Sequence, residues 1–347
     1  MNLQLLERLC QAPGIASREN AVRAVVDEAI RPIVDDISVD TMGNLIATRA
    51  GSGPRIMLAA HMDEIGFLVK HIDDRGFIRI QPVGGFDPRV LTAQRILIHR
   101  RTGHPLPGVL QSGARPIHLL QPGDSKELKF DDLFIDTGES AESVKSTVSV
   151  GDMITLNRPT AQMGNTVVSK ALDDRLGVYV MIEAVRAATS GTAEIVAVAT
   201  TQEEVGLRGA QTAAYDLQPD IAIALDVTLA ADIPGTPAES SVTSLGEGAA
   251  IKLFDSSQLP HPAIIDTFRA LAEHEDIPHQ LEVLPSGGTD AGAIQRSRGG
   301  VYTGTLSIPC RYVHTVNEMA HVDDIDACVT LLARFIESVS LDQLRYQ

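Results

Sequence analysis

The sequence predicts an α/β fold interrupted by a smaller β-rich insert, and three observations support this. The chain of 347 residues is 44% hydrophobic but only 4% aromatic, with no tryptophan, so its core must consist mainly of Ala, Val, Leu and Ile. From residue 165 onward, apolar runs of strand length alternate with stretches of helical periodicity, which is typical of α/β proteins. Residues 67–160 instead carry short apolar alternations separated by turn signals, as in a small barrel or sandwich.

The N-terminal segment begins with two predicted helices. The first covers residues 2–10 and is stopped by Pro13 and Gly14. The second covers residues 18–30, with Ser17 as its N-cap. Residues 39–49 are expected to form a hairpin, because Met-Gly-Asn at 42–44 supplies a turn. Residues 55–60 are apolar enough to form a buried strand, which ends at His61.

The C-terminal segment alternates helices and strands. We expect helices at 173–188, 206–216, 262–275 and 323–338. We expect strands at 193–201, 221–227, 249–254, 280–284 and 301–307. Residues 1–66 and 163–347 are therefore predicted to form one discontinuous α/β domain, and residues 67–162 an inserted domain.

Composition excludes several classes of protein. The formal net charge of −16 argues against a nucleic-acid partner. No apolar run approaches the roughly 18 residues that a membrane span needs, and Glu7 and Arg8 interrupt the apolar start that a signal peptide would require. Three widely spaced cysteines, Cys10, Cys310 and Cys328, favour a reducing compartment. We therefore expect a cytoplasmic protein without a membrane or nucleic-acid partner.

Two adjacent carboxylates, Glu203 and Glu204, follow the apolar run from Ile195 to Ala199. In an open α/β sheet, the carboxyl ends of the strands line the ligand-binding crevice. Two neighbouring carboxylates repel each other there unless a positive group compensates. We interpret the pair as one metal ligand and one acid/base group, the alternative being a solvated pair at a strand end.

Four further places put metal-type ligands at a strand end or a helix start. His61 and Asp63 lie on the same side of an extended segment, so the carboxylate can accept a hydrogen bond from the imidazole. Asp173 begins a predicted helix, Asp226 ends an apolar strand, and His314 follows another. A helix cap, a solvated carboxylate or a hydrogen-bonded histidine is the alternative for each. Together they suit Zn²⁺, Co²⁺ or Mn²⁺, and a bridging carboxylate would divide the ligands between two ions.

The motifs that carry these residues resemble those of one known family. In chain order they read HMDEIG, ALDDRLG, TTQEEVGLRGA, ALDVTLAADIPG, LPSGGTDAGAI and PCRYVHT, between residues 61 and 315. With this set the chain resembles the tetrahedral (dodecameric) metallo-aminopeptidases, which include bacterial glutamyl aminopeptidase and proteins labelled endoglucanase. The resemblance implies a mixed-sheet, dinuclear-metal exopeptidase domain and an inserted small β-barrel that mediates dimerisation.

The resemblance also implies how the metal ligands are shared. His61 and Asp226 would hold one metal ion. Glu204 and His314 would hold the other, and Asp173 would bridge the two.

Three further roles follow from the same resemblance. Glu203 would be the general base for a water that bridges the metals, and Asp63 would orient the imidazole at position 61. The loop of Gly287, Gly288 and Thr289 would lie near the substrate, the alternative being a flexible turn before a helix.

The implied function is a metal-dependent aminopeptidase that removes N-terminal residues from short peptides. It would use two divalent ions per subunit (zinc, or cobalt or manganese) and self-associate as dimers that assemble into a dodecamer. One alternative is an amidohydrolase acting on non-peptide amides with the same residues. An endo-1,4-glucanase is disfavoured by the lack of tryptophan and leaves both histidines unexplained, and a non-catalytic binding protein is disfavoured by Glu203. Acidic, leucine-type and lysine preferences at the N-terminal residue stay open, as does the metal.

Overall fold

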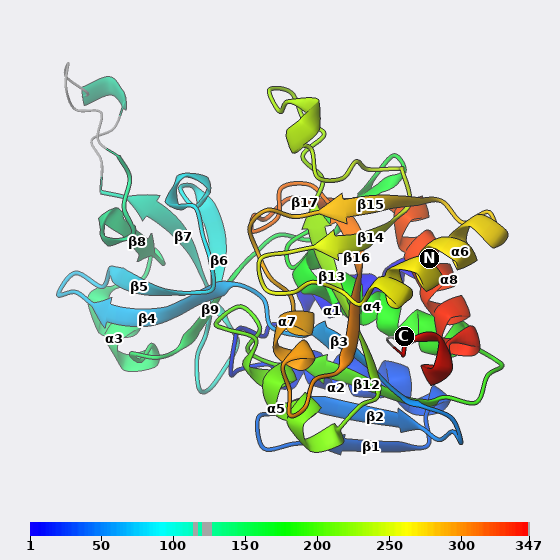
Figure 1. Cartoon of the computed structure of the whole chain (residues 1–347). Coiled ribbons are helices and arrows are strands. Elements are labelled where there is room, and N and C mark those ends of the chain that lie inside the picture. Colours follow the sequence, from blue (N-terminus) through cyan, green and yellow to red (C-terminus); the bar gives the residue numbers. More distant parts are fainter. Residues whose placement is uncertain (114–116, 120–126, 346–347) are drawn as a thin grey trace. The chain divides into compact units, whose positions relative to one another are not determined.

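The chain forms two compact units (Figure 1). The computed structural model describes residues 1–113, 117–119 and 127–345. The α/β unit comprises Met1–Glu64, Pro159–Val313 and Asn317–Gln347, and the barrel unit comprises Ile65–Arg158 with His314–Val316. Each unit has its own hydrophobic core.

A mixed sheet forms the centre of the α/β unit. Within the described residues it has eight strands, in the order β1-β2-β12-β3-β13-β16-β14-β15. Strands β12, β3, β13 and β16 are parallel, whereas β2 and β14 pair antiparallel to their neighbours β12 and β16. The strands are β1 (Asp36–Val39), β2 (Leu45–Arg49), β12 (Glu194–Thr200), β3 (Arg55–His61), β13 (Ile221–Leu229), β16 (Tyr302–Cys310), β14 (Ala249–Phe254) and β15 (His279–Val283).

Both faces of the central strands β12, β3 and β13 are buried, which explains why these strands are almost entirely apolar. Successive side chains of a strand point to opposite faces. In β3, Ile56, Leu58 and Ala60 join the main core, whereas Met57 and Ala59 join a second core on the other face.

Helices cover the two faces unequally. The main core is closed by α1 (Leu3–Gln11), α2 (Asn20–Ile30), α4 (Leu172–Ala187), α6 (Pro262–His274) and α8 (Val322–Ser338). The second core is closed by α5 (Arg208–Leu217) and α7 (Asp290–Gln295). Within the described ranges, none of the helices combines the length and apolar character needed to span a bilayer.

A small three-stranded sheet in the α/β unit was not predicted. It consists of β10 (Ala161–Met163), β11 (Thr166–Ser169) and β17 (Glu318–His321), in that order. These strands are too short to show a clear alternation of apolar and polar residues. The register pairs Ser169 with Glu318, which places the Glu318 side chain at the start of α4.

In the described part of the barrel unit, six strands close in the order β4-β5-β8-β7-β6-β9. They are β4 (Gly66–Ile72), β5 (Ile78–Val83), β6 (Gln94–His99), β7 (Leu106–Ser112), β8 (Leu133–Asp136) and β9 (Met153–Leu156). A short helix, α3 (Ala141–Thr147), is capped by the Ser140 side chain. The predicted α/β fold with an inserted small β-barrel is thus confirmed.

The predicted N-cap of α2 is wrong. The helix begins at Asn20, with Glu19 in the N-cap position. Ser17 has a φ of 68°, and its N–H donates to Glu19 Oε1 at 2.8 Å. A turn closed by the Arg18 N–H and the Ile15 carbonyl at 2.8 Å comes before the helix, so Ser17 lies too early to cap it.

Candidate metal centre

Acidic and histidine side chains gather at the C-terminal edge of the parallel strands in the α/β unit. The register of β12 and β3 pairs Thr200 with His61, the last residue of each strand. Parallel strands therefore deliver their following residues to the same edge of the sheet. The predicted residues at this edge are His61, Asp63, Asp173, Glu203, Glu204 and Asp226.

The two adjacent glutamates lie in a tight loop that follows β12. β12 already ends at Thr200, and Gln202 has a left-handed φ of 57°. The amides of Gly206 and Leu207 then donate to the Glu203 carbonyl at 2.8 and 2.9 Å. This turn lets the side chains of neighbouring residues reach different positions in one cluster.

His61 is buried against three acidic residues. Its Nε2 lies 3.1 Å from Asp173 Oδ1 and 3.8 Å from Glu203 Oε2. Its Nδ1 lies 3.0 Å from the backbone carbonyl of Asp63 and 3.5 Å from the Asp63 carboxylate. Burial lowers the pKa of His61, but the carboxylates of Glu203, Asp173 and Asp63 outweigh burial and raise the pKa well above its ordinary value.

Asp63 makes contacts that the spacing of His61 and Asp63 does not reveal. The side chain is fully buried. Its Oδ1 accepts the N–H of Glu203 at 3.0 Å, and its Oδ2 accepts the N–H of Glu204 at 3.2 Å. The carboxylate thus holds the loop that carries the two glutamates, and orientation of the His61 imidazole by Asp63 stays a prediction.

The start of α4 is fixed by hydrogen bonds from distant segments. Asp173 and Asp174 are joined by a cis peptide bond. The Asp173 N–H donates to Glu318 Oε2 at 3.0 Å. Asp174 accepts the backbone N–H of His61 at 3.2 Å and that of Gly177 at 2.9 Å. Asp174 thereby ties β3 to the first turn of the helix.

A buried ion cluster lies beside this turn. Lys170 Nζ is 2.5 Å from Glu64 Oε2, and Arg175 is 3.6 Å from Glu64 Oε1. Arg175 also donates to the Ala12 carbonyl at 2.9 Å. These two cations are held by Glu64 and by backbone carbonyls, so they position the motifs from residues 61 and 171 against each other.

Two groups of side-chain atoms could each hold a metal ion. One atom from each of His61, Asp173 and Glu204 lies within 4.8 Å of the others, and the same holds for His61, Asp174 and Asp226. Imidazole nitrogen and carboxylate oxygen are donors that suit Zn²⁺, Co²⁺ and Mn²⁺. Asp174 is the member of these groups that the sequence did not predict.

Electrostatics support the same interpretation. Burial raises the pKa of Asp174, Asp226 and Glu203 well above the ordinary values, and repulsion between neighbouring carboxylates adds to the effect. A bound divalent cation would offset both the cost of burial and the repulsion between the carboxylates, because it stabilises the charged form of every carboxylate near it. The residues present therefore fit a metal ion.

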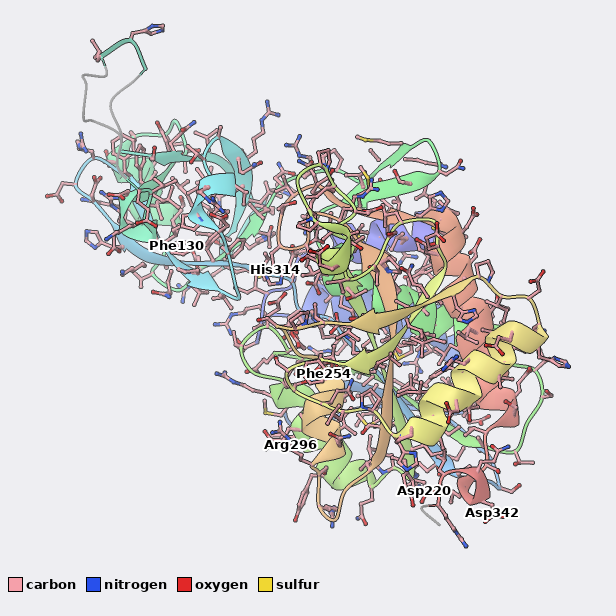
Figure 2. The ribbon with its side chains drawn as sticks, turned by 45° about the horizontal axis from the view of Figure 1, so that its top comes forward. Phe130, Asp220, Phe254, Arg296, His314 and Asp342 are labelled. Atoms are coloured by element: carbon pink, nitrogen blue, oxygen red, sulfur yellow. The ribbon has the colours of Figure 1, made fainter. Side chains whose placement is uncertain are left out.

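His314, labelled in Figure 2, is grouped with the barrel unit. It has a left-handed φ of 63°. A Cβ added to Gly85 of the same unit would lie 3.3 Å from His314 Nδ1. Its role as a metal ligand stays a prediction.

The predicted substrate loop packs against a neighbouring turn of the α/β unit. Gly287 has a φ of 116°, and a Cβ on Gly288 would meet Ser257 at 2.9 Å. Thr289 is buried, and its N–H donates to Ser257 Oγ at 3.3 Å. Contact between this loop and substrate stays a prediction.

Asp290 ends the loop motif that the resemblance places near the substrate, and its side chain is buried. Its Oδ2 accepts the Thr200 hydroxyl at 2.5 Å. Burial raises the pKa of Asp290 to about 6. From sequence alone, an Asp at the start of a helix is expected to be an exposed cap. Only the fold reveals that Asp290 contacts Thr200, where the end of β12 pairs with the end of β3.

A mixed α/β sheet with a buried His/Asp/Glu cluster at its C-terminal edge fits a metal-dependent enzyme. The M42 glutamyl aminopeptidase family matches residues 43–331, and the chain belongs to this family. It is 34% identical to the lysyl aminopeptidase of Pyrococcus furiosus, over 97% of each chain.

Solved structures agree. Aminopeptidase APDkam598 from the archaeon Desulfurococcus kamchatkensis superposes with a TM-score of 0.94 at 38% identity, covering 99% of this chain and 96% of that one. The TET1 peptidase of Pyrococcus horikoshii superposes with a TM-score of 0.85 at 33% identity, covering 97% and 99%. The chain is thus a metal-dependent aminopeptidase that removes N-terminal residues from peptides. This confirms the family, the fold class and the enzyme class that the motifs indicated.

Proposed function

We propose that the cluster holds two divalent metal ions and that Glu203 is the general base. The supporting observation is the arrangement around His61. Glu203 Oε2 approaches the imidazole to 3.8 Å, yet among the described residues Glu203 belongs to neither group of candidate ligands. Glu204 belongs to one of these two groups. This difference supports Glu204 as a metal ligand and Glu203 as the base.

The ligands would be shared as follows. Asp173 would bridge the ions, His61 and Asp226 would hold the first, and Glu204 would hold the second. His314 would complete the second set, an assignment that rests on the family resemblance. Asp174 would not bind a metal ion directly. It would hold the backbone of His61 and the first turn of α4 in place, since both of its carboxylate oxygens already accept backbone N–H groups.

The chemistry divides between the ions and the side chains. When bound, the divalent ions polarise the scissile carbonyl and make a water molecule more acidic. Glu203 accepts a proton from the attacking water and returns it to the leaving amine. Burial raises the pKa of Glu203, which makes it a stronger proton acceptor. Asp63 keeps Glu203 in place through the backbone N–H that its carboxylate accepts.

Three further features complete the proposal. The ions would be zinc, cobalt or manganese, because imidazole and carboxylate ligands suit each of them. The chain would self-associate, as TET1 peptidase does when it assembles into a tetrahedron or a large octahedral shell, with dimers and a dodecamer expected from the resemblance. The three cysteines are free and buried, which supports a reducing compartment such as the cytoplasm.

The proposal is tested by measuring activity on several substrates with each of several metal ions. The purified protein is stripped with a chelator, reloaded with zinc, cobalt or manganese, and assayed on a panel of amino-acyl p-nitroanilides. We expect no turnover without metal and recovery with at least one ion. Full activity of the stripped protein would overturn the metal mechanism, and turnover of N-acetylated substrates would overturn the exopeptidase assignment.

A further inference from the structure

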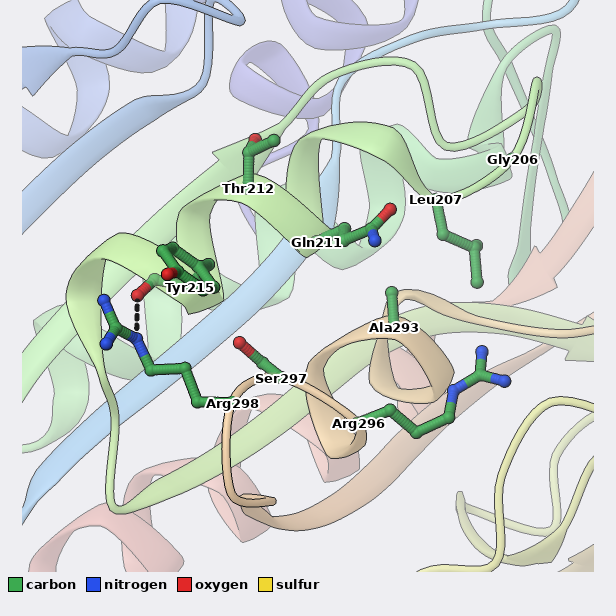
Figure 3. A pocket seen from close by; sticks show the side chains of 9 residues that line it. All are labelled: Gly206, Leu207, Gln211, Thr212, Tyr215, Ala293, Arg296, Ser297 and Arg298. Atoms are coloured by element: carbon green, nitrogen blue, oxygen red, sulfur yellow. Dashed lines mark hydrogen bonds between the residues drawn. The ribbon is translucent and has the colours of Figure 1, made fainter.

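A groove lies between α5 and α7 on the α/β unit, with a volume of about 740 Å³ (Figure 3). One end is formed by Gly206 and Leu207, which directly follow the loop of the two glutamates. The other side is formed by the C-terminal end of α7. The groove therefore begins beside the candidate metal centre and leads away from it along two helices.

The groove is positively charged in a strongly acidic protein. The chain has 45 acidic and 29 basic residues other than histidine. Among the described residues that line the groove, none is acidic and two, Arg296 and Arg298, are arginines. This local reversal of charge favours an anionic occupant.

The two arginines differ in how they are held. Arg298 Nε donates to the Tyr215 carbonyl at 2.5 Å, and its guanidinium lies 4.0 Å above the Tyr215 ring. Arg296 is exposed at the surface of the unit (Figure 2), and its Nε donates to the Gly292 carbonyl at 2.8 Å. Within the described part of the chain, no carboxylate pairs with either. The outer nitrogens of Arg296 are thus available for a bidentate contact with an anion.

A buried hydroxyl adds a second polar feature. Ser297 lines the groove but is only 8% exposed. Its Oγ has no hydrogen-bond partner among the described residues, and in Figure 3 it points from the end of α7 toward α5. Buried hydroxyls normally have a partner, so an additional polar molecule in the groove would complete the Tyr215 side, which Ser297 faces, while Arg296 points to the opposite side (Figure 3).

The position of Arg296, just after α7, limits the length of a peptide that could reach from the metal centre to its guanidinium. α7 begins with Asp290, whose carboxylate is bonded to Thr200 at the strand end beside His61. Arg296 is the residue just after α7, six positions from Asp290, which places its backbone about 9 Å farther along; because its Nε reaches back to the Gly292 carbonyl, its guanidinium lies no farther than that. An extended peptide rises by about 3.3–3.6 Å per residue, so roughly three residues span the same distance.

We propose that this groove binds the C-terminal carboxylate of a short peptide substrate, with Arg296 as its main partner. The proposal rests on the proposed function, because it requires the N-terminal end of the peptide to lie at the metal centre. Arg296 is then a specificity-determining residue that favours short peptides with a free C-terminus.

The test compares two forms of one tripeptide. Xaa-Ala-Ala is used with a C-terminal acid or a C-terminal amide, where Xaa is the residue preferred in the p-nitroanilide panel. Because the C-terminal amide lacks the negative charge that pairs with a guanidinium, we expect wild type to favour the acid by about tenfold in kcat/KM, mainly through KM. Arg296→Gln should abolish this preference and leave p-nitroanilide hydrolysis unchanged.

Two further variants isolate the cause. Arg296→Lys keeps the charge and should retain part of the preference. Arg269→Gln removes an exposed arginine from α6, on the other face of the sheet, and should behave as wild type. Equal kcat/KM for acid and amide in wild type would overturn the proposal, as would an unchanged preference in Arg296→Gln or its equal loss in Arg269→Gln.

Inorganic phosphate separates a peptide carboxylate from a free anion. If the carboxylate occupies the groove, phosphate should compete with the acid tripeptide in wild type and not in Arg296→Gln. Phosphate that raises Tm of wild type only, while acid and amide have equal KM, would show a free-anion site and refute the peptide role. If no p-nitroanilide is cleaved at all, the proposed function fails, and calorimetric binding of the two tripeptides still tests the groove.

Discussion

Substituting Asp63 by Asn should separate positioning of the catalytic loop from general stability. Asp63 Oδ1 and Oδ2 each accept one backbone N–H, from Glu203 at 3.0 Å and Glu204 at 3.2 Å. Asn has nearly the same shape, but one of its oxygens is replaced by an NH₂ donor. One of the two N–H groups would therefore face another donor in a fully buried site.

The magnitude follows from these contacts. Losing one hydrogen bond to a charged acceptor costs about 1.5–3 kcal/mol, and leaving a buried donor unpaired costs about 1–3 kcal/mol. Relaxation of the loop recovers part of this, so we expect an overall cost of about 3 kcal/mol. If the displaced loop carries the base, the cost falls on the transition state and lowers kcat/KM on the order of 100-fold.

A matched control is present in the same unit. Asp324 is also buried, and its two oxygens accept the N–H groups of Gly248 at 2.7 Å and Gly246 at 2.8 Å. Asp324→Asn should destabilise folding by a comparable amount in urea denaturation, without lowering kcat/KM of the folded fraction. An equal loss of kcat/KM in both variants, or wild-type kcat/KM in Asp63→Asn, would refute the positioning role.

Two further predictions concern the same cluster. Glu203→Gln should keep its metal content by mass spectrometry and lose nearly all turnover; substantial turnover in a metal-loaded variant would exclude Glu203 as the base. In the metal-free protein, the raised pKa values of Glu203, Asp174 and Asp226 mean that the folded state binds more protons than the unfolded chain. Stability therefore falls as pH rises, so Tm of the chelated protein should drop as pH rises above the ordinary carboxylate pKa of about 4. Saturating metal should remove most of this drop. A Tm that does not change with pH in the metal-free protein would show that the pKa values of these carboxylates are not raised in the folded state.

The parts of the fold that the sequence predicted are those with long, uniform patterns. The run from Ile221 to Leu225 is wholly apolar, because β13 is buried on both faces. A polar residue at the end of such a strand, such as Asp226, stands out against it. His61 at the end of β3 stands out in the same way, so both residues could be proposed as metal ligands from the sequence alone.

The remaining features depend on long-range contacts. β10 and β11 are too short to carry a pattern, and β17 joins them from far along the chain. Nothing near Asp290 in the sequence indicates that its partner is Thr200, 90 residues away. The loop contacts of Asp63 likewise join residues 140 and 141 positions apart, so only the folded chain reveals them.

The number of divalent ions bound per chain tests the central claim most directly. Wild type and Asp173→Ala are loaded with zinc or cobalt, desalted, and analysed by mass spectrometry together with protein concentration. A bridging Asp173 predicts two ions per chain in wild type and loss of both in the variant. A single ion in wild type, or two ions retained by Asp173→Ala, would contradict the dinuclear centre.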